Sequence, residues 1–220
     1  MPRYPQRDHL SRPLLILCEG RSDEAFFRAL IGHRGLTEFG IRNGMDSGPN
    51  SGGGISQFGP LLTAMRTWKT FDIVTDILIV ADNDLDPDEN FNKVRTQIEA
   101  TGQYAIPNAP LVKESGTPTI QVMMIPGTKK QGNLESLCVE AAIDAHPDIA
   151  KCVDNFADCV DADCWEEVTL REKMRLRSLL AAAHKPDPFI GLGNTWREEP
   201  TLIPLSHSCF DWIAKVLSSY

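Results

Sequence analysis

The stretch ILIVADNDLD at residues 77–86 joins a strongly apolar segment to a series of acids. Apolar residues reach back to Ile73, and a run that is apolar on both faces is typical of a strand at the centre of a parallel sheet. We therefore predict a strand over Ile73–Ala81, with Asp82 and Asp84 directly after its carboxyl end. If the strand continues through these two acids, both side chains project to the same face of the sheet.

Three more apolar runs predict the rest of the sheet. They cover Leu14–Cys18, Phe39–Ile41 and Thr119–Ile125. Apolar residues at helical spacing predict helices between and after the strands, and Ser22 is the expected cap of the first helix. The predicted helices cover Asp23–Ile31, Gln57–Lys69, Asp88–Thr101, Asn133–Asp144, Asp148–Val160, Trp165–Ala183 and Ser206–Leu217, with a loop over Lys185–Pro204.

The order of these elements predicts the architecture. Strands that alternate with helices form parallel βαβ units with right-handed crossovers, so we expect an α/β fold with a mainly parallel four-stranded sheet flanked by helices. The predicted organisation is a flexible tail over residues 1–12, an α/β core over residues 13–145 and a helical extension over residues 146–220. We expect the extension to pack on the core and to form a single domain with it.

Composition narrows the class of protein. The chain has 220 residues, of which 42% are hydrophobic and 24% charged, as is usual for a globular protein. Its net charge of −8 argues against a nucleic-acid binder with a basic surface, although bound cations reverse the local field at a site. No apolar run reaches membrane-spanning length, and the polar N-terminus does not resemble a signal peptide. The six cysteines have no framework spacing, which predicts reduced thiols in the cytoplasm.

Acids at the strand ends predict a metal site. Glu19 follows the first strand, Asp82 and Asp84 follow the third, and ligands of open α/β sheets bind at this edge where the strand order switches. Asp23 lies four residues after Glu19, in the first turn of a helix, and can face the same crevice. Neighbouring carboxylates repel one another unless a divalent cation lies among them, and oxygen ligands select Mg²⁺, Mn²⁺ or Ca²⁺.

Other polar residues have two interpretations each. Glu135 opens a helix, where it is either a partner of the helix dipole or a further metal ligand. Four basic residues in one helix form either a solvated face or a source of cations for phosphate: Arg171, Lys173, Arg175 and Arg177. Asp86, Asp88 and Glu89 are expected to cap the next helix or to solvate the loop, with metal ligation as the alternative. Cys152, Cys159 and Cys164, like the His207–Cys209 pair, lack the sequence spacing of a zinc site.

Two segments of the chain resemble a known superfamily. LLILCEGRSDEAFF at residues 14–27 and ILIVADNDLD at residues 77–86 resemble the TOPRIM domain of topoisomerases, primases and OLD-type nucleases. The shared features are a Glu after the first strand and an Asp-x-Asp after the third. Residues 52–56 (GGGIS) and 132–135 (GNLE), together with Lys173, add to the likeness with small stand-alone TOPRIM-like proteins related to the OLD family.

The resemblance implies a TOPRIM-like, that is Rossmann-like, core with Mg²⁺ or Mn²⁺ as cofactor. Glu19, Asp82 and Asp84 would be catalytic and hold one ion, while Asp23 and Glu135, with Ser136 near it, would help to hold a second. Lys173 would offset charge on the scissile phosphate. No P-loop is present, so a TOPRIM unit of this form would either need a separate ATPase partner protein or have a simpler task than the OLD-type enzymes.

The expected function is therefore metal-dependent cleavage of DNA or RNA, by a nuclease or by the nuclease subunit of a larger enzyme. One alternative is a non-catalytic module that binds nucleic acid or a protein through the same crevice. A second alternative is a phosphatase of the haloacid-dehalogenase type, in which Asp82 is the nucleophile and Asp84 the acid. We expect no association with a membrane in any of these cases.

Overall fold

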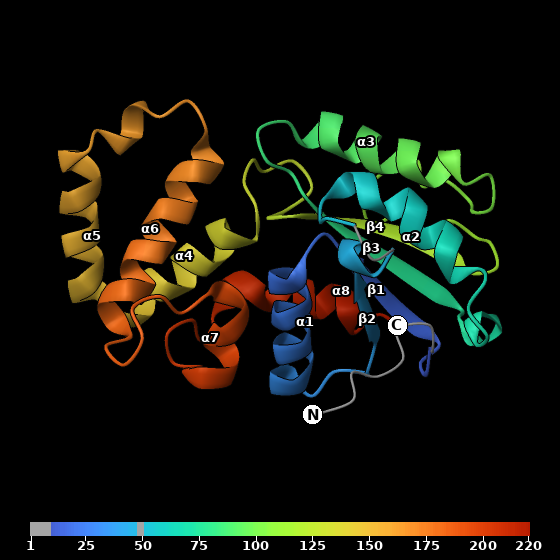
Figure 1. Cartoon of the computed structure of the whole chain (residues 1–220), viewed down its shortest axis with the longest axis horizontal. Coiled ribbons are helices and arrows are strands. Elements are labelled where there is room, and N and C mark those ends of the chain that lie inside the picture. Colours follow the sequence, from blue (N-terminus) through green and yellow to red (C-terminus); the bar gives the residue numbers. More distant parts are fainter. Residues whose placement is uncertain (1–9, 48–50) are drawn as a thin grey trace.

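The computed structural model describes residues 10–47 and 51–220, and an all-parallel sheet lies at its centre (Figure 1). The four strands are β1 (Leu14–Cys18), β2 (Gly40–Asn43), β3 (Asp76–Asp82) and β4 (Thr119–Ile125). Their order in the sheet is β2-β1-β3-β4. The predicted α/β fold with a four-stranded parallel sheet is confirmed, and the arrangement is consistent with a Rossmann-like fold.

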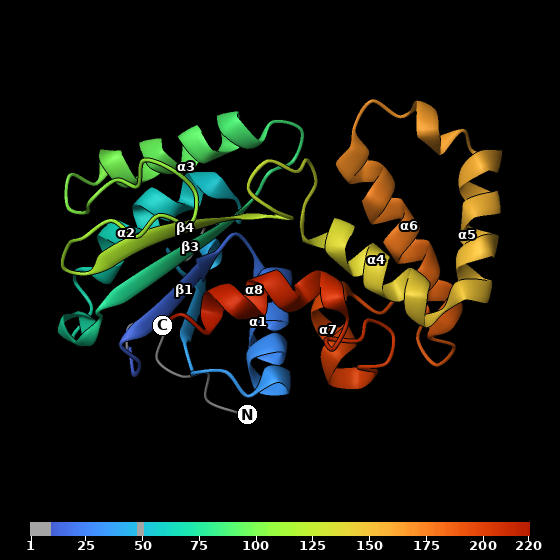
Figure 2. The ribbon, with the colours of Figure 1, turned by 180° about the vertical axis from the view of Figure 1, so that it is seen from behind.

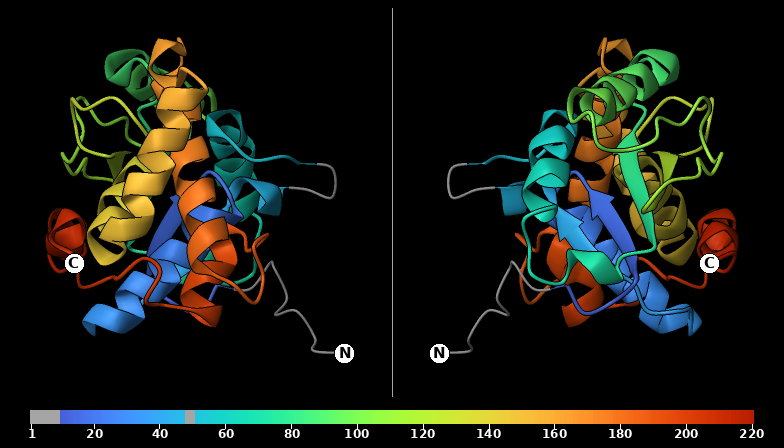
Figure 3. Two further views of the ribbon diagram at one scale, coloured as in Figure 1. Left: turned by 90° about the vertical axis from the view of Figure 1, so that its left-hand side faces the viewer. Right: turned by 90° about the vertical axis from the view of Figure 1, so that its right-hand side faces the viewer.

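Helices cover both faces of the sheet. Helices α1 (Arg21–Arg34) and α8 (Asp211–Leu217) lie on one face, and α2 (Phe58–Met65) and α3 (Pro87–Ala100) lie on the other. Figures 2 and 3 show α8 and α2 on opposite sides of the strands. The side chains of β1 alternate accordingly, because Ile16 and Cys18 join the apolar core beneath α1, whereas Leu15 and Leu17 join the core beneath α2 and α3.

The remaining helices extend from one end of the sheet. They are α4 (Leu134–Ala145), α5 (Pro147–Cys159), α6 (Val168–Ala183) and α7 (Leu192–Glu198), and Figure 1 shows α4, α5 and α6 beyond the strands. Short 3₁₀ segments cover Gly44–Ser47, Ile55–Gln57, Phe71–Ile73, Ala162–Cys164 and Ser208–Phe210. The extension shares the core of the α1 face, where the ring of Phe26 lies 5.5 Å from that of Trp196 and 5.2 Å from that of Phe210.

Several predicted boundaries are corrected by local contacts. The strands Leu14–Cys18 and Thr119–Ile125 are confirmed as predicted. Helix α1, however, begins at Arg21 with Gly20 as its N-cap rather than Ser22, because the carboxylate of Asp23 accepts a hydrogen bond from the Gly20 N–H at 2.8 Å. Strand β2 lies later than the predicted Phe39–Ile41, since Gly40 pairs with Leu15 and the pairing continues to Asn43.

The C-terminal half also departs from the prediction in two places. The predicted loop over Lys185–Pro204 contains α7, which packs against α1 through the buried Trp196. Helix α6 begins at Val168 rather than Trp165, and α8 begins at Asp211 rather than Ser206. Of the predicted tail, residues 1–9 lie outside the described residues, whereas Leu10 is buried and its N–H donates to Thr70 Oγ1 at 2.7 Å.

The strand order places a topological switch between β1 and β3. The chain leaves β1 for β2 on one side and then returns across the sheet to β3 on the other side. Helix α1 of the first crossover and α2 of the second lie on opposite faces. The carboxyl ends of β1 and β3 are therefore the edge where doubly wound sheets bind their ligands. Within the described residues, no helix combines the length and the apolar character that crossing a bilayer requires.

Candidate functional site

Glu19 and Asp82 meet at the switch point. Glu19 follows the last residue of β1, and Asp82 is the last residue of β3, so parallel pairing brings the two strand ends together. The Asp82 N–H donates a hydrogen bond to Glu19 Oε1 at 2.9 Å. The predicted meeting of acids from two separate strands is thus present in the structure.

Asp84 reaches the same site by a different route from the one predicted. Strand β3 ends at Asp82, and Asp84 has a positive φ of 47°, so the two aspartates do not share a continuing strand face. Asp84 and Gly132 instead exchange two backbone hydrogen bonds of 2.8 Å, which join the loop after β3 to the loop before α4. The Asn90 side-chain amide donates to Asp84 Oδ2 at 3.3 Å and holds the carboxylate in place.

The first turn of α4 contacts the acids at the end of β3. Asn133 is the N-cap, and its side chain and that of Ser136 form a reciprocal capping box, so Ser136 has a structural role here. The Leu134 N–H at the start of the helix donates to Asp82 Oδ1 at 3.1 Å. Glu135 follows in the same turn, and its charge raises the pKa values of Asp23 and Asp82.

Burial and mutual repulsion make these acids difficult to ionise. Burial is the largest cause of a rise in the pKa of Glu19 to about 7, to which the charges of Asp23 and Asp84 add. Burial and the charge of Glu135 likewise raise the pKa of Asp23 to about 6, although the bond from the Gly20 N–H opposes this rise. The pKa of the partly buried Asp82 is raised well above its usual range by burial, then by the charges of Asp23 and Glu19.

Lys173 brings positive charge to the cluster from α6. Its ammonium lowers the pKa values of both Glu19 and Asp23. Lys173 and Glu135 line one cavity of about 530 Å³ together with Arg177, Ser22 and Phe189. Within residues 10–47 and 51–220, the side chains of Lys173 and Arg177 form neither a hydrogen bond nor an ion pair. The cavity therefore presents two available cations beside a group of carboxylates.

The other charged residues singled out in the sequence have structural partners. Arg171 pairs with Asp163 at 3.3 Å, and Arg175 pairs with Asp154. Asp86 is the N-cap of α3, where its Oδ1 accepts from the Glu89 N–H at 2.9 Å, as one of the two interpretations proposed. Asp88 and Glu89 form ion pairs with lysines, at 2.6 Å and 2.8 Å. These residues lie outside the carboxylate cluster.

A glycine-rich loop packs against Glu19. The Gly54 N–H donates to the Glu19 carbonyl oxygen at 3.2 Å. A Cβ atom at Gly53 would lie 2.8 Å from that same oxygen, and one at Gly54 would lie 3.8 Å from Glu19 Oε2. These glycines therefore allow the backbone to approach Glu19 closely, at the positions where the sequence shows GGGIS.

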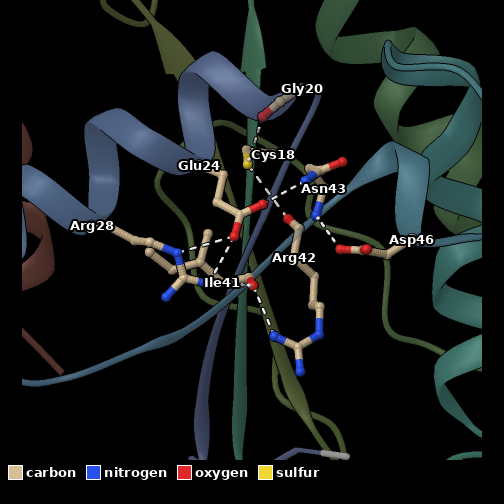
Figure 4. A network of polar contacts seen from close by, with 8 residues as sticks. All are labelled: Cys18, Gly20, Glu24, Arg28, Ile41, Arg42, Asn43 and Asp46. Atoms are coloured by element: carbon tan, nitrogen blue, oxygen red, sulfur yellow. Dashed lines mark hydrogen bonds and ion pairs between the residues drawn. The ribbon is translucent and has the colours of Figure 1, made fainter. Parts of the chain in front are cut away.

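A polar network joins Cys18 and Gly20, the sequence neighbours of Glu19, to α1 and β2 (Figure 4). The Asn43 side chain at the end of β2 donates to Glu24 Oε2 at 2.5 Å, and Arg28 donates to Glu24 Oε1 at 2.7 Å. The Cys18 thiol donates to the carbonyl oxygen of Arg42 at 3.4 Å. These bonds tie β1, the first turn of α1 and β2 together, which limits movement of the intervening Glu19.

Asn90 is a site residue that the sequence analysis missed. Its buried side-chain amide donates to the carbonyl oxygen of Asn83 at 3.0 Å and to that of Asp82 at 3.3 Å, in addition to Asp84. The signal in the sequence is its position, because residues 90, 94 and 98 form one buried stripe of α3 and only the first of them is polar. A polar residue on a buried helical stripe indicates a fixed partner.

Comparison with protein families gives one match. The model of a family described as a protein of unknown function, DUF3226, matches residues 13–208. The chain belongs to the DUF3226 family. The matched range contains every residue of the carboxylate cluster as well as Lys173. Neither a curated protein nor a solved structure matches the chain significantly. For this member of DUF3226, inferences about function therefore depend on the site itself.

Proposed function

We propose that this DUF3226 protein is a divalent-metal-dependent enzyme that cleaves phosphodiester bonds in nucleic acid. The observation that supports the proposal is the gathering of five acids around the β1–β3 switch point, beside a cavity with two available cations. The acids are Glu19, Asp23, Asp82, Asp84 and Glu135. The resemblance of residues 14–27 and 77–86 to the TOPRIM domain supports the same chemistry.

The donor set fits magnesium or manganese. All five side chains offer carboxylate oxygens, which these hard cations prefer. The raised pKa values of Glu19, Asp23 and Asp82 mean that the metal-free site holds negative charge at a cost, which a bound cation would remove. Glu19, Asp82 and Asp84 would hold one ion, and Asp23 and Glu135 would help to hold a second. Such ions, when bound, activate water and stabilise a leaving oxygen.

The remaining residues bind and position the substrate. The charge of the Lys173 ammonium acts on the carboxylate cluster, because it lowers the pKa values of Glu19 and Asp23. It can therefore offset the negative charge that develops on the scissile phosphate. Arg177 lines the same cavity and offers a planar guanidinium to a neighbouring phosphate. The Leu134 N–H and the Asn90 amide hold Asp82 and Asp84, so the carboxylates are oriented before a ligand arrives.

The two alternative functions give Asp82 and Glu19 different roles. A phosphatase of the haloacid-dehalogenase type uses Asp82 as nucleophile but gives Glu19 no role, although Glu19 accepts a hydrogen bond from Asp82 itself. A non-catalytic module would bind metal and nucleic acid without cleavage. A separate ATPase partner and a cytoplasmic location stay predictions from the sequence.

The test is a cleavage assay with supercoiled plasmid and labelled RNA in Mg²⁺ or Mn²⁺. The D82N/D84N variant is expected to lose activity, because two carboxylates of the proposed site are neutralised. Asn is close in size to Asp, and the change removes repulsion, so the variant should fold. The matched control is D86N/D88N, which neutralises two neighbouring acids outside the cluster and should cleave as the wild type does.

Equal cleavage by the wild type and D82N/D84N would overturn the proposal. Mg²⁺ binding measured by calorimetry, without cleavage of any DNA or RNA substrate, would favour the binding module instead. Trapping of a phosphate analogue on Asp82 would favour the phosphatase.

A further inference from the structure

A second group of potential ligands includes residues of α4 that lie about one to three helical turns after Glu135 of the carboxylate cluster. Glu140 and Asp144 are four residues apart on α4, so they share one helix face. His207 and Cys209 lie just before α8, in the turn that contains Ser208–Phe210. Segments more than 60 residues apart in sequence thus bring four ligand-type side chains to one place.

The distances within this group are short. One carboxylate oxygen of Glu140, one ring nitrogen of His207 and Cys209 Sγ all lie within 4.8 Å of one another. A tetrahedral zinc ion holds such atoms about 3.5 Å apart, so small side-chain rotations are enough to close the site. His207 and Cys209 are partly buried, whereas Glu140 is exposed and leaves the group open to solvent.

Asp144 orients the histidine. His207 Nε2 lies 2.9 Å from Asp144 Oδ2, and Nδ1 accepts the Cys209 N–H at 3.3 Å. A proton on Nε2 satisfies the contact with Asp144, and the single lone pair on Nδ1 then accepts the Cys209 N–H. A metal ion bound to Nδ1 would take the place of this 3.3 Å hydrogen bond. A carboxylate that holds one ring nitrogen while the other binds metal is the usual arrangement around zinc-bound histidine.

The Cys209 thiol points toward α4, because its proton is donated to the Leu137 carbonyl oxygen at 3.5 Å. A bound divalent ion would replace this proton.

We propose that Glu140, His207 and Cys209 form a site for zinc or a similar transition-metal ion, with Asp144 as the positioning residue of His207. The sulfur, nitrogen and oxygen donors select a softer ion than the all-oxygen cluster at the switch point does. Binding releases the Cys209 proton to solvent as the thiolate takes the metal, and the fourth position is open to water. The ion would join α4 to the start of α8. The site is independent of the proposed nuclease function.

The test is a titration of the metal-free full-length protein with Co²⁺, followed by absorption spectroscopy. We expect a thiolate-to-cobalt charge-transfer band and tetrahedral visible bands that saturate at one equivalent, and we expect Zn²⁺ but not Mg²⁺ to remove them. C209S and H207A should abolish the bands. D144N should weaken cobalt affinity by about 10–100-fold, as loss of an orienting carboxylate does at other sites.

Two controls make the result specific. C152A removes an exposed thiol on α5 and should leave the bands unchanged, as should D82N/D84N at the other site. Circular dichroism of each variant checks that the fold is retained. A wild-type protein without the charge-transfer band at saturating Co²⁺, or a band that persists in a folded C209S protein, would overturn the proposal.

Discussion

The hydrogen bond of 2.9 Å from the Asp82 N–H to Glu19 Oε1 joins two residues that lie 63 positions apart in the sequence. Glu19 directly follows β1, and Asp82 ends the adjacent strand β3. The bond satisfies one oxygen of Glu19 but does not neutralise its charge. Burial therefore still dominates, and the pKa of Glu19 rises to about 7 from an ordinary value of 4.5. A buried carboxylate in this position costs stability whenever it is ionised and no cation is bound.

The first prediction concerns the pH dependence of stability without metal. Because the folded state holds the Glu19 proton more tightly than the unfolded state does, the protein should lose stability as pH rises from about 4.5 through 7. The E19Q variant has no charge to ionise and its amide oxygen can still accept from Asp82. We expect it to be more stable than the wild type at pH 8 by about 1–3 kcal/mol, and little different at pH 4.5.

Thermal unfolding in a chelating buffer between pH 4.5 and pH 8.5 measures this difference. Mg²⁺ should stabilise the wild type at pH 8 more than it stabilises E19Q. E99Q is the matched control, because Glu99 is exposed on α3 and its removal should leave the pH curve unchanged. If the stability of E19Q changes with pH in parallel with that of the wild type, the raised pKa of Glu19 is contradicted.

The second prediction concerns Asn90. Its amide donates to the Asp82 and Asn83 carbonyl oxygens and to Asp84 Oδ2, so N90A removes three contacts at the end of β3. We expect the free energy of unfolding to fall by about 1–3 kcal/mol and Mg²⁺ affinity to fall as well, since Asp84 loses its support. Chemical denaturation and calorimetry measure the two effects. N92A, at an exposed position of the same helix, should change neither quantity.

The sequence alone predicted the sheet better than it predicted the ends of the helices. Leu14–Cys18 and Thr119–Ile125 are apolar runs bounded by turn residues, so their limits are visible without the structure. The start of α1 is decided by one hydrogen bond from the Gly20 N–H to Asp23. The sequence instead indicated Ser22 as the cap, because serine favours that position and two acids follow it. Helix α7 has only seven residues and contains Gly193 and Asn194, so tertiary packing of Trp196 rather than propensity determines it.

The candidate site was predictable where it depends on strand ends. Glu19 and Asp82 follow from parallel pairing, which brings the carboxyl ends of adjacent strands together. The backbone turn at Asp84 was not visible, because its pairing with Gly132 joins loops 48 residues apart. The His207–Cys209 pair was set aside on sequence spacing and Glu140 was not considered, because the three residues converge only through the packing of the segment before α8 on α4.

The third prediction uses the glycine-rich loop. A Cβ atom at Gly53 would come within 2.8 Å of the Glu19 carbonyl oxygen, whereas one at Gly52 would meet nothing within 4 Å. We therefore expect G53A to push the loop away from Glu19 and to weaken Mg²⁺ binding by about tenfold, which corresponds to a shift of about 1.4 kcal/mol. G52A is the matched control and should bind as the wild type does. Calorimetric titration of both variants with Mg²⁺ measures the difference. Equal Mg²⁺ affinities of G53A and G52A would show that the loop adapts without disturbing Glu19.

The last prediction concerns the exposed Phe189, and it depends on the proposed action on nucleic acid. Its side chain is 92% exposed and lines the cavity that also contains Lys173 and Arg177. An aromatic ring beside two cations suits an unpaired base whose phosphates contact the cations, and such stacking contributes about 1–3 kcal/mol per base. F189A should therefore bind a labelled single-stranded oligonucleotide about tenfold more weakly in a fluorescence anisotropy titration.

The free energy of unfolding of F189A should equal that of the wild type, because almost none of the ring is buried. F156A is the control, since Phe156 is also exposed, at 47%, but lies on α5 and outside the cavity. It should leave oligonucleotide affinity unchanged. If both variants bind as the wild type does, the strand does not pass through this cavity. A loss of affinity in F189A alone would place a base beside Lys173, on the side of the carboxylate cluster where the scissile phosphate is proposed to lie.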